Sequence, residues 1–205
     1  MDAALVILFA QSLLIGLSIA APVGPIGLLV IQRTLQRGRV LGLATGLGAA
    51  VADAVYGAVG AFGVASLIHT LQSARVPLAL GGGVFLLWLA WRTWLAEPLQ
   101  SAAMVADARS LFGCFAGTLM LTLSNPATIF SFIAVFGALG ARGPATSPWL
   151  MVAGVLIGSA LWWLLLCTVV GRMRARFDRH WQRRINRASA LLLAAFAIGQ
   201  LLWVV

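Results

Sequence analysis

The chain has 205 residues, of which 61% are hydrophobic and 9% are charged, and its formal net charge at pH 7 is +9. Its mean hydropathy of +1.00 is far above that of a soluble domain. These values exclude an ordinary soluble domain and predict an all-α membrane protein. The two cysteines and two histidines show no recognisable ligand spacing, so we expect no metal site and no cofactor.

Six apolar segments are each long enough to form a membrane-spanning helix, which needs about 20 mostly apolar residues. They cover residues 4–31, 40–68, 77–95, 111–141, 148–171 and 188–205. The connections are short, so we expect a single transmembrane domain over residues 1–205. Six helices divide into two three-helix halves, and an odd number of spans in each half reverses the direction of the second. The sequence therefore predicts two inverted halves.

The distribution of arginines supports six helices. All 14 basic residues are arginines, and twelve of them fall in alternate connections, which would share one side of the membrane. These twelve are Arg33, Arg37, Arg39, Arg92, Arg109 and the seven arginines from Arg172 to Arg187. Because positive residues accumulate on the cytoplasmic side, we expect both termini to be periplasmic in a bacterial inner membrane. We interpret residues 172–187 as a cytoplasmic loop that touches anionic lipid of the bilayer, and not as a nucleic-acid-binding element.

Prolines interrupt the first helix of each predicted half. Pro22 and Pro25 lie in the first segment and Pro126 lies in the fourth. A proline removes a backbone donor and clashes with the preceding turn. Matched interruptions in the two halves of a membrane protein point to the substrate site of a transporter, because half-helix ends present free backbone groups. Structural kinks satisfied by neighbouring helices are the alternative.

Asp53 lies deep in the second apolar segment, about 20 Å from either end at 1.5 Å per residue. Acids at this depth usually face protein or water and serve ion or proton pathways. Burial favours the neutral form of a carboxyl group, so we expect Asp53 to exchange a proton during transport. Tyr56 lies on a neighbouring face of the same helix. A protonated carboxyl that only holds helices together is the alternative.

The break in the fourth segment has polar residues on both sides of its proline. Residues 122–128 read Thr-Leu-Ser-Asn-Pro-Ala-Thr. The amide of Asn125 and the hydroxyl of Thr128 can both donate and accept hydrogen bonds, as recognition of a zwitterion requires. A helix cap is the alternative role of Asn125, and the two roles are compatible.

Together these residues resemble the lysine exporter (LysE/RhtB) family of amino-acid exporters. The likeness rests on residues 21–28 (APVGPIGL), 33–39 (RTLQRGR), 52–57 (ADAVYG) and 125–130 (NPATIF). It implies a homodimer that exports amino acids or related small metabolites from the bacterial cytoplasm, driven by protons or by the membrane potential. The functional residues it implies are Pro22, Gly24, Pro25, Asp53, Asn125 and Pro126.

This chain departs from the family pattern directly after the asparagine-proline pair. Many members carry a lysine or an arginine there, whereas this chain has Ala127 and Thr128. The substrate therefore cannot be transferred from better-known members. We count Thr128 and Tyr56 with the expected substrate-binding residues.

Three other classes of function are alternatives to export. An intramembrane enzyme needs a nucleophile and a base, or clustered acids, at depth, and the sequence contains neither arrangement. A metal-cation exporter would need several hard oxygen ligands or soft cysteine and histidine ligands, which a lone Asp53 does not supply. A non-transporting membrane scaffold would also use kinks and glycine-rich helices.

Overall fold

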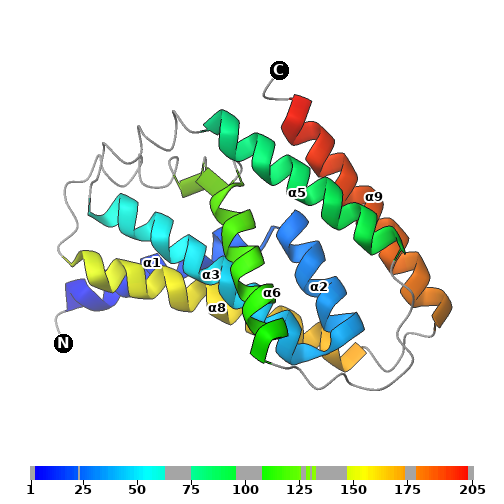
Figure 1. The fold of residues 1–205 in the computed structure, drawn as a ribbon. Helices are drawn as coiled ribbons and strands as arrows, with labels where there is room; N and C mark the ends of the chain where they lie inside the picture. The colour runs from blue at the N-terminus through cyan, green and yellow to red at the C-terminus, as the bar shows by residue number, and fades with distance from the viewer. Residues whose placement is uncertain are drawn as a thin grey trace.

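The structure is a computed structural model, and it describes residues 3–22, 24–62, 75–95, 108–125, 128–129, 131–132, 147–173 and 179–202. The regular elements in these ranges are all helices (Figure 1). The longer ones are α1 (Ala3–Ala20), α2 (Pro25–Arg37), α3 (Arg39–Ala61), α5 (Arg75–Leu95), α6 (Ala108–Leu123), α8 (Pro148–Met173) and α9 (Arg179–Leu202).

The helices follow the six apolar segments, and two of these segments are interrupted near their prolines. The first segment forms two helices, because α1 ends at Ala20 and α2 begins at Pro25. In the fourth segment α6 ends at Leu123, and residues 128–129 and 131–132 are helical again. The predicted stretches 63–68, 133–141 and 203–205 lie outside the described residues.

Two predicted helix boundaries are wrong. The helix of the first segment continues past residue 31 to Arg37, and α9 begins at Arg179 and not at residue 188. Residues 172–187 are therefore not a loop throughout, because α8 also runs to Met173. Arginine is a good helix former, so these helices extend past the apolar residues that marked them in the sequence.

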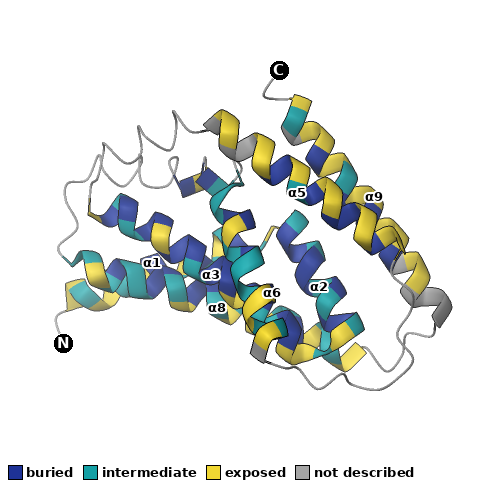
Figure 2. Ribbon diagram, viewed as in Figure 1, coloured by how far each residue is buried: buried dark blue, intermediate teal, exposed yellow. Residues whose placement is uncertain are grey.

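The described helices have the character of a membrane protein. By length and composition α1, α3 and α8 could each cross a bilayer. Exposed positions lie along the outer faces of several helices (Figure 2). Many exposed residues are large and apolar, among them Leu161, Leu165 and Leu191. Soluble monomers rarely expose contiguous apolar surface of this extent, so the outer surface suits lipid.

The helices form two groups with α2 between them. In the first group α3 packs against both α8 and α6, and α1 packs against α8. The second group is the pair of α5 and α9, which lie side by side (Figure 1). Since α2 contacts α3 and α8 as well as α9, this half-helix connects the two groups.

Buried polar pairs fix α2 against the second group. Thr93 on α5 donates from Oγ1 to Oε1 of Gln32 at 3.2 Å. Gln36 donates from Nε2 to Oδ1 of Asn186 on α9 at 2.5 Å. Gln32, Thr93 and Asn186 are all buried. Buried polar groups are costly when unpaired, so these pairs favour one position of α5 and α9 relative to α2.

Glycines allow α1 and α8 to approach closely. Gly16 of α1 lies against the backbone of Val155, and Gly158 of α8 lies against the carbonyl group of Leu13. A Cβ atom at either glycine would overlap the partner's backbone. Small residues permit such contacts between membrane helices, so this contact depends on the absence of side chains.

We predict that Gly158→Ala destabilises the protein by about 1–3 kcal/mol, because the added methyl group overpacks the contact between α1 and α8. The measurement is thermal unfolding of the purified protein in detergent. Gly117→Ala is the matched control, since a Cβ atom at Gly117 of α6 would meet no atom within 4 Å. Equal melting temperatures for the two variants would contradict the prediction.

Candidate functional site

Asp53 is buried at the contact between α3 and α8, with 3% of its surface exposed. Its Oδ2 accepts a hydrogen bond from Oγ of Ser159 at 2.7 Å. The same Ser159 oxygen accepts a hydrogen bond from Nε1 of Trp163 at 3.2 Å. Both α8 residues are buried. The carboxyl group thus has a neutral hydroxyl as its partner, and this partner can serve the ionised or the protonated carboxyl.

Small residues of α3 bring Asp53 close to α8. A Cβ atom at Gly46 would lie 2.5 Å from Cβ of Trp163, and one at Gly57 would lie 3.4 Å from the side chain of Val155. The two glycines lie before and after Asp53 on the helix. They allow the close approach that puts the carboxyl group within reach of Ser159.

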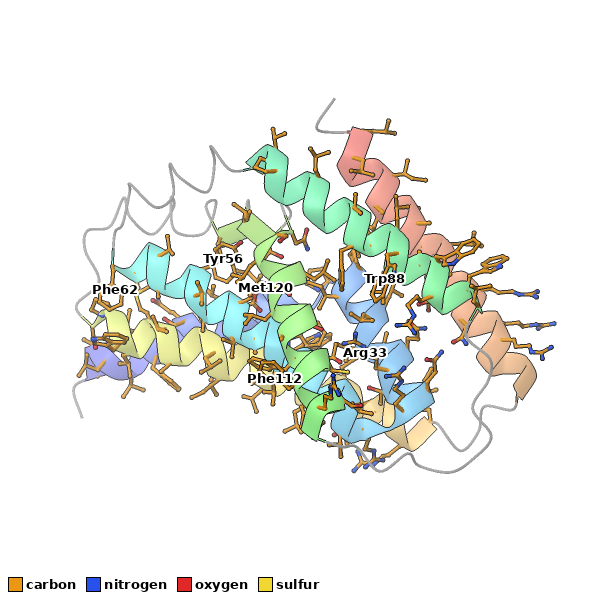
Figure 3. All side chains as sticks on the ribbon, in the orientation of Figure 1. Arg33, Tyr56, Phe62, Trp88, Phe112 and Met120 are labelled. Atoms are coloured by element: carbon orange, nitrogen blue, oxygen red, sulfur yellow. The ribbon has the colours of Figure 1, made fainter. Side chains whose placement is uncertain are left out.

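Tyr56 connects α3 to the break in the fourth segment. Its hydroxyl donates to the carbonyl oxygen of Leu123 at 2.6 Å, and Leu123 is the last residue of α6. The Tyr56 ring stacks on Phe132, with 5.5 Å between the ring centroids. The label in Figure 3 shows Tyr56 beside the upper end of α6. A carbonyl group at an interrupted helix end thereby gains a side-chain partner.

Asn125 links the two helical parts of the fourth segment. Its backbone N–H donates to the carbonyl oxygen of Thr122 at 3.1 Å, and its own carbonyl oxygen accepts from the N–H of Ile129 at 3.2 Å. The second bond places Asn125 at an N-cap position, which agrees with the capping alternative. Thr128 is half-buried in the following turn. Pro126 lies outside the described residues.

The first break separates α1 from α2, and Gly24 is extended where α2 begins. Gly24 donates its N–H to the carbonyl oxygen of Pro22 at 2.9 Å, and its own carbonyl oxygen accepts from Leu28 at 3.1 Å. Pro25 is the first residue of α2 and Gly24 is its N-cap. Pro22 is exposed, whereas Gly24 and Pro25 are half-buried. A Cβ atom at Gly24 would meet no atom within 4 Å, so there is open space beside this break.

One apolar cluster borders both breaks. Tyr56, Phe132 and Val155 belong to its buried part. Ile19, near the end of α1, and Leu123, at the end of α6, pack against the same cluster. The segments that precede the two breaks therefore share one packing environment. Asp53 lies one turn before Tyr56 on α3, which puts it close to this cluster.

Three functional candidates escaped the sequence analysis. Neither Ser159 nor Trp163 belongs to a sequence motif. The one indication in the sequence was that the polar Ser159 follows Gly158 in the glycine-containing helix α8. For Arg33 the sequence predicts only a place among the cytoplasmic charges. In the structure its guanidinium contacts α3 and α6. Within the described ranges, no three His, Cys, Asp or Glu side chains are grouped so that they could hold a metal ion.

Comparisons with known proteins place the chain among transporters. The LysE type translocator family matches residues 17–202. The uncharacterized membrane protein YahN of Escherichia coli is 31% identical, over 82% of this chain and 78% of YahN. The arginine exporter protein ArgO of Pectobacterium atrosepticum is 24% identical, over 95% of this chain and 92% of ArgO. These matches confirm the family resemblance seen in the sequence.

A further relative is named for signalling and not for export. The chemotactic transduction protein ChpE of Pseudomonas aeruginosa is 27% identical, over 93% of this chain and 95% of ChpE. No solved structure matches the chain.

We predict that Tyr56→Phe lowers stability by about 1–3 kcal/mol, because the carbonyl group of Leu123 loses its partner while the ring stays on Phe132. Thermal unfolding of the purified protein measures the effect. Tyr56→Leu, which also removes the stacking, should cost more. A Tyr56→Phe variant as stable as the wild type would show that the hydrogen bond contributes nothing.

Proposed function

Because the chain belongs to the LysE type translocator family, we propose that it exports amino acids or related small metabolites by secondary active transport. The observation that carries this proposal is the family match over nearly the whole chain, together with the similarity to an arginine exporter. Members of this family are transporters and not enzymes. Protons or the membrane potential would supply the energy.

We propose six membrane spans in two inverted halves, and the helix contacts support this arrangement. A pseudo-two-fold axis would exchange the first span with the fourth, the second with the fifth and the third with the sixth. The contact of α1 with α8 then corresponds to that of α6 with α3, and both contacts are extensive. The pairs α3–α8 and α5–α9 would each lie across the axis, and both pairs are in contact.

The proposed substrate site lies between the two breaks. Its residues are Pro22, Gly24, Pro25, Tyr56, Asn125, Pro126 and Thr128. The support is the shared apolar cluster and the open space beside Gly24. A half-helix start offers N–H groups to a carboxylate, and a half-helix end offers carbonyl groups to an ammonium group. Such a site suits an amino acid, which carries both charges.

Asp53 is the proposed proton-coupling residue, and its partner suggests how the coupling works. The ionised carboxylate attracts the Ser159 proton strongly, because charge-assisted hydrogen bonds are stronger than neutral ones. Protonation of Asp53 removes that charge and weakens the bond between α3 and α8. These helices come from different halves of the proposed repeat, so the proton would bias how the halves pack.

The remaining features follow from the family and from the charges. We propose a homodimer in the bacterial inner membrane, on the basis of the family resemblance. A metal-cation exporter and a non-transporting scaffold are the alternative functions. Of these two alternatives, the scaffold has support from a relative, because ChpE is named as a chemotactic transduction protein. A scaffold in signalling is therefore the alternative that we compare with transport. A screen of substrate-loaded vesicles with an imposed pH gradient separates transport from a scaffold, because only a transporter releases its substrate in response to the gradient.

We predict that both termini are periplasmic, because twelve of the 14 arginines then lie on the cytoplasmic side. An alkaline phosphatase fused to the C-terminus should be active. A green fluorescent protein fused to the same end should be exported with it and should not fluoresce. A fluorescent C-terminal fusion with an inactive phosphatase fusion would exclude the six-span arrangement.

We predict that Asp53→Asn folds and inserts but abolishes pH-driven efflux. The amide oxygen can still accept from Ser159, so the packing survives, while the titrating group is lost. Exchange of substrate at equal pH should be spared, and Asp53→Glu should retain part of the coupled activity. The assay is efflux from proteoliposomes at matched protein density. A wild-type rate for the Asn variant would make Asp53 a structural residue.

A further inference from the structure

Arg33 directs its guanidinium group into the protein. Its Nη1 donates to Oγ1 of Thr45 on α3 at 3.0 Å, to Oγ1 of Thr118 on α6 at 3.3 Å and to the carbonyl oxygen of Cys114 at 3.3 Å. The two threonines are fully buried. Figure 3 shows Arg33 beside α2 and the lower part of α6. One side chain of α2 thus holds both α3 and α6.

A role in membrane topology does not account for this orientation. An arginine that only marks the cytoplasmic side extends its charge into water while its stem covers apolar surface. Arg37, one turn later on α2, is exposed in that way, whereas Arg33 is only partly exposed. The Arg33 charge instead contacts buried neutral oxygens. These contacts only partly offset the loss of water around a cation.

The surroundings of Nη1 are built from acceptors. Thr45 donates its hydroxyl proton to the carbonyl oxygen of Leu41 at 2.8 Å, and Thr118 donates its proton to that of Cys114 at 2.9 Å. The threonine oxygens can therefore only accept from Arg33. No carboxylate pairs with Arg33 within the described residues, among which Asp53 is the one acid.

Part of the guanidinium group is available to a ligand. Nε and Nη2 of Arg33 bond to no atom of the described residues. No fully buried side-chain nitrogen or oxygen in the described ranges lacks a partner, so these two groups are not completely buried. Their N–H bonds form the fork that binds a carboxylate in a bidentate manner. A carboxylate would also supply the charge that the neutral acceptors lack.

Polar side chains connect Arg33 with the second break. Thr118 and Thr122 follow each other at helical spacing on α6 and are both buried. The next residue, Leu123, is the one whose carbonyl oxygen binds Tyr56. Arg33 and the break thus lie along one contact between α3 and α6. Arg33 is nearer the side that the arginine distribution assigns to the cytoplasm.

The interface between α3 and α6 is tightly packed in the structure. Gly48 of α3 lies against the carbonyl group of Phe115 on α6, and a Cβ atom there would also lie 3.1 Å from the backbone nitrogen of Leu119. The hydrogen bonds of Arg33 to both helices reinforce the contact. A substrate that passes here must separate α6 from α2 and α3.

We propose that Arg33 is the residue that binds the substrate's carboxylate on the cytoplasmic side, and that this binding releases α6 from α2 and α3. The carboxylate binds the unpaired Nε and Nη2 groups, and this ion pair draws the guanidinium group away from the three neutral acceptors of Nη1. The inference rests on the proposed export function. It restricts the substrates to molecules with a free carboxylate, and it makes Arg33 a specificity-determining residue.

The test compares free amino acids with their carboxamides in proteoliposomes. The twenty standard L-amino acids are screened first, and the best one is measured against its own carboxamide for wild type, Arg33→Gln, Arg33→Lys and Arg37→Gln. We expect Arg33→Gln to raise KM for the free amino acid about ten- to a hundredfold, because the variant loses a charge-assisted hydrogen-bonded pair. Transport of the carboxamide should change little, so the preference for the carboxylate disappears.

The conservative and control variants separate binding from structure. Arg33→Lys keeps the charge but not the fork, so it should retain an intermediate preference, and it carries the test if Arg33→Gln does not fold. Arg37→Gln should behave as wild type. An undiminished preference for the carboxylate in the Arg33 variants refutes this inference alone. A wild-type protein that transports none of the amino acids refutes amino-acid export as the function, and this inference with it.

Alkylation of Cys114 provides a readout that does not depend on transport. This cysteine of α6 is buried beside Arg33, and Cys167→Ala removes the other thiol. The free amino acid should raise the alkylation rate severalfold, and its carboxamide should not. Arg33→Gln should be alkylated faster than wild type without any ligand. Equal rates with the free amino acid and its carboxamide would refute the release of α6.

Discussion

In hydrocarbon every backbone N–H and C=O group needs a partner within the protein, and the two interrupted helices of this chain depend on that constraint. At the first break the Gly24 amide turns back onto Pro22. At the second break the Leu123 carbonyl group is held by the Tyr56 hydroxyl. The interrupted helices are therefore stable because neighbouring groups form hydrogen bonds with the backbone N–H and C=O groups that lack a partner within the helix. A ligand that enters there competes for the same groups.

The helix α3 is the element on which the other contacts converge. Thr45 accepts from Arg33 of α2, Asp53 accepts from Ser159 of α8, and Tyr56 donates to the end of α6. Glycines on the same helix allow all three of these neighbours to approach closely, since Gly42 meets α2, Gly46 meets α8 and Gly48 meets α6. One helix thus carries the proposed proton-coupling residue and also contacts the second break and Arg33. Under the proposed function, a shift of α3 relative to α8 would change the contacts of Asp53, of the second break and of Arg33.

Prediction from the sequence succeeded where a local rule applies and failed where it does not. Prolines break helices through their own chemistry, so the interruptions could be placed from Pro22, Pro25 and Pro126 alone. Helix ends could not, because hydropathy marks the apolar part of a helix while arginine continues it. For that reason α2 reaches Arg37 and α9 begins at Arg179. Whether the two breaks together form the substrate site remains a prediction.

The sequence by itself determined the membrane class, the broken helices and the place of Asp53 inside a long apolar helix, because composition and helix breaking are local properties of the chain. Only the tertiary structure decided the partners. Ser159 is 106 positions from Asp53, and Leu123 is 67 positions from Tyr56. Whether Arg33 faces lipid headgroups or buried threonines also depends on where α6 packs. A hydrogen bond between distant positions leaves no periodic trace in one sequence, since each partner alone is an ordinary serine, leucine or arginine.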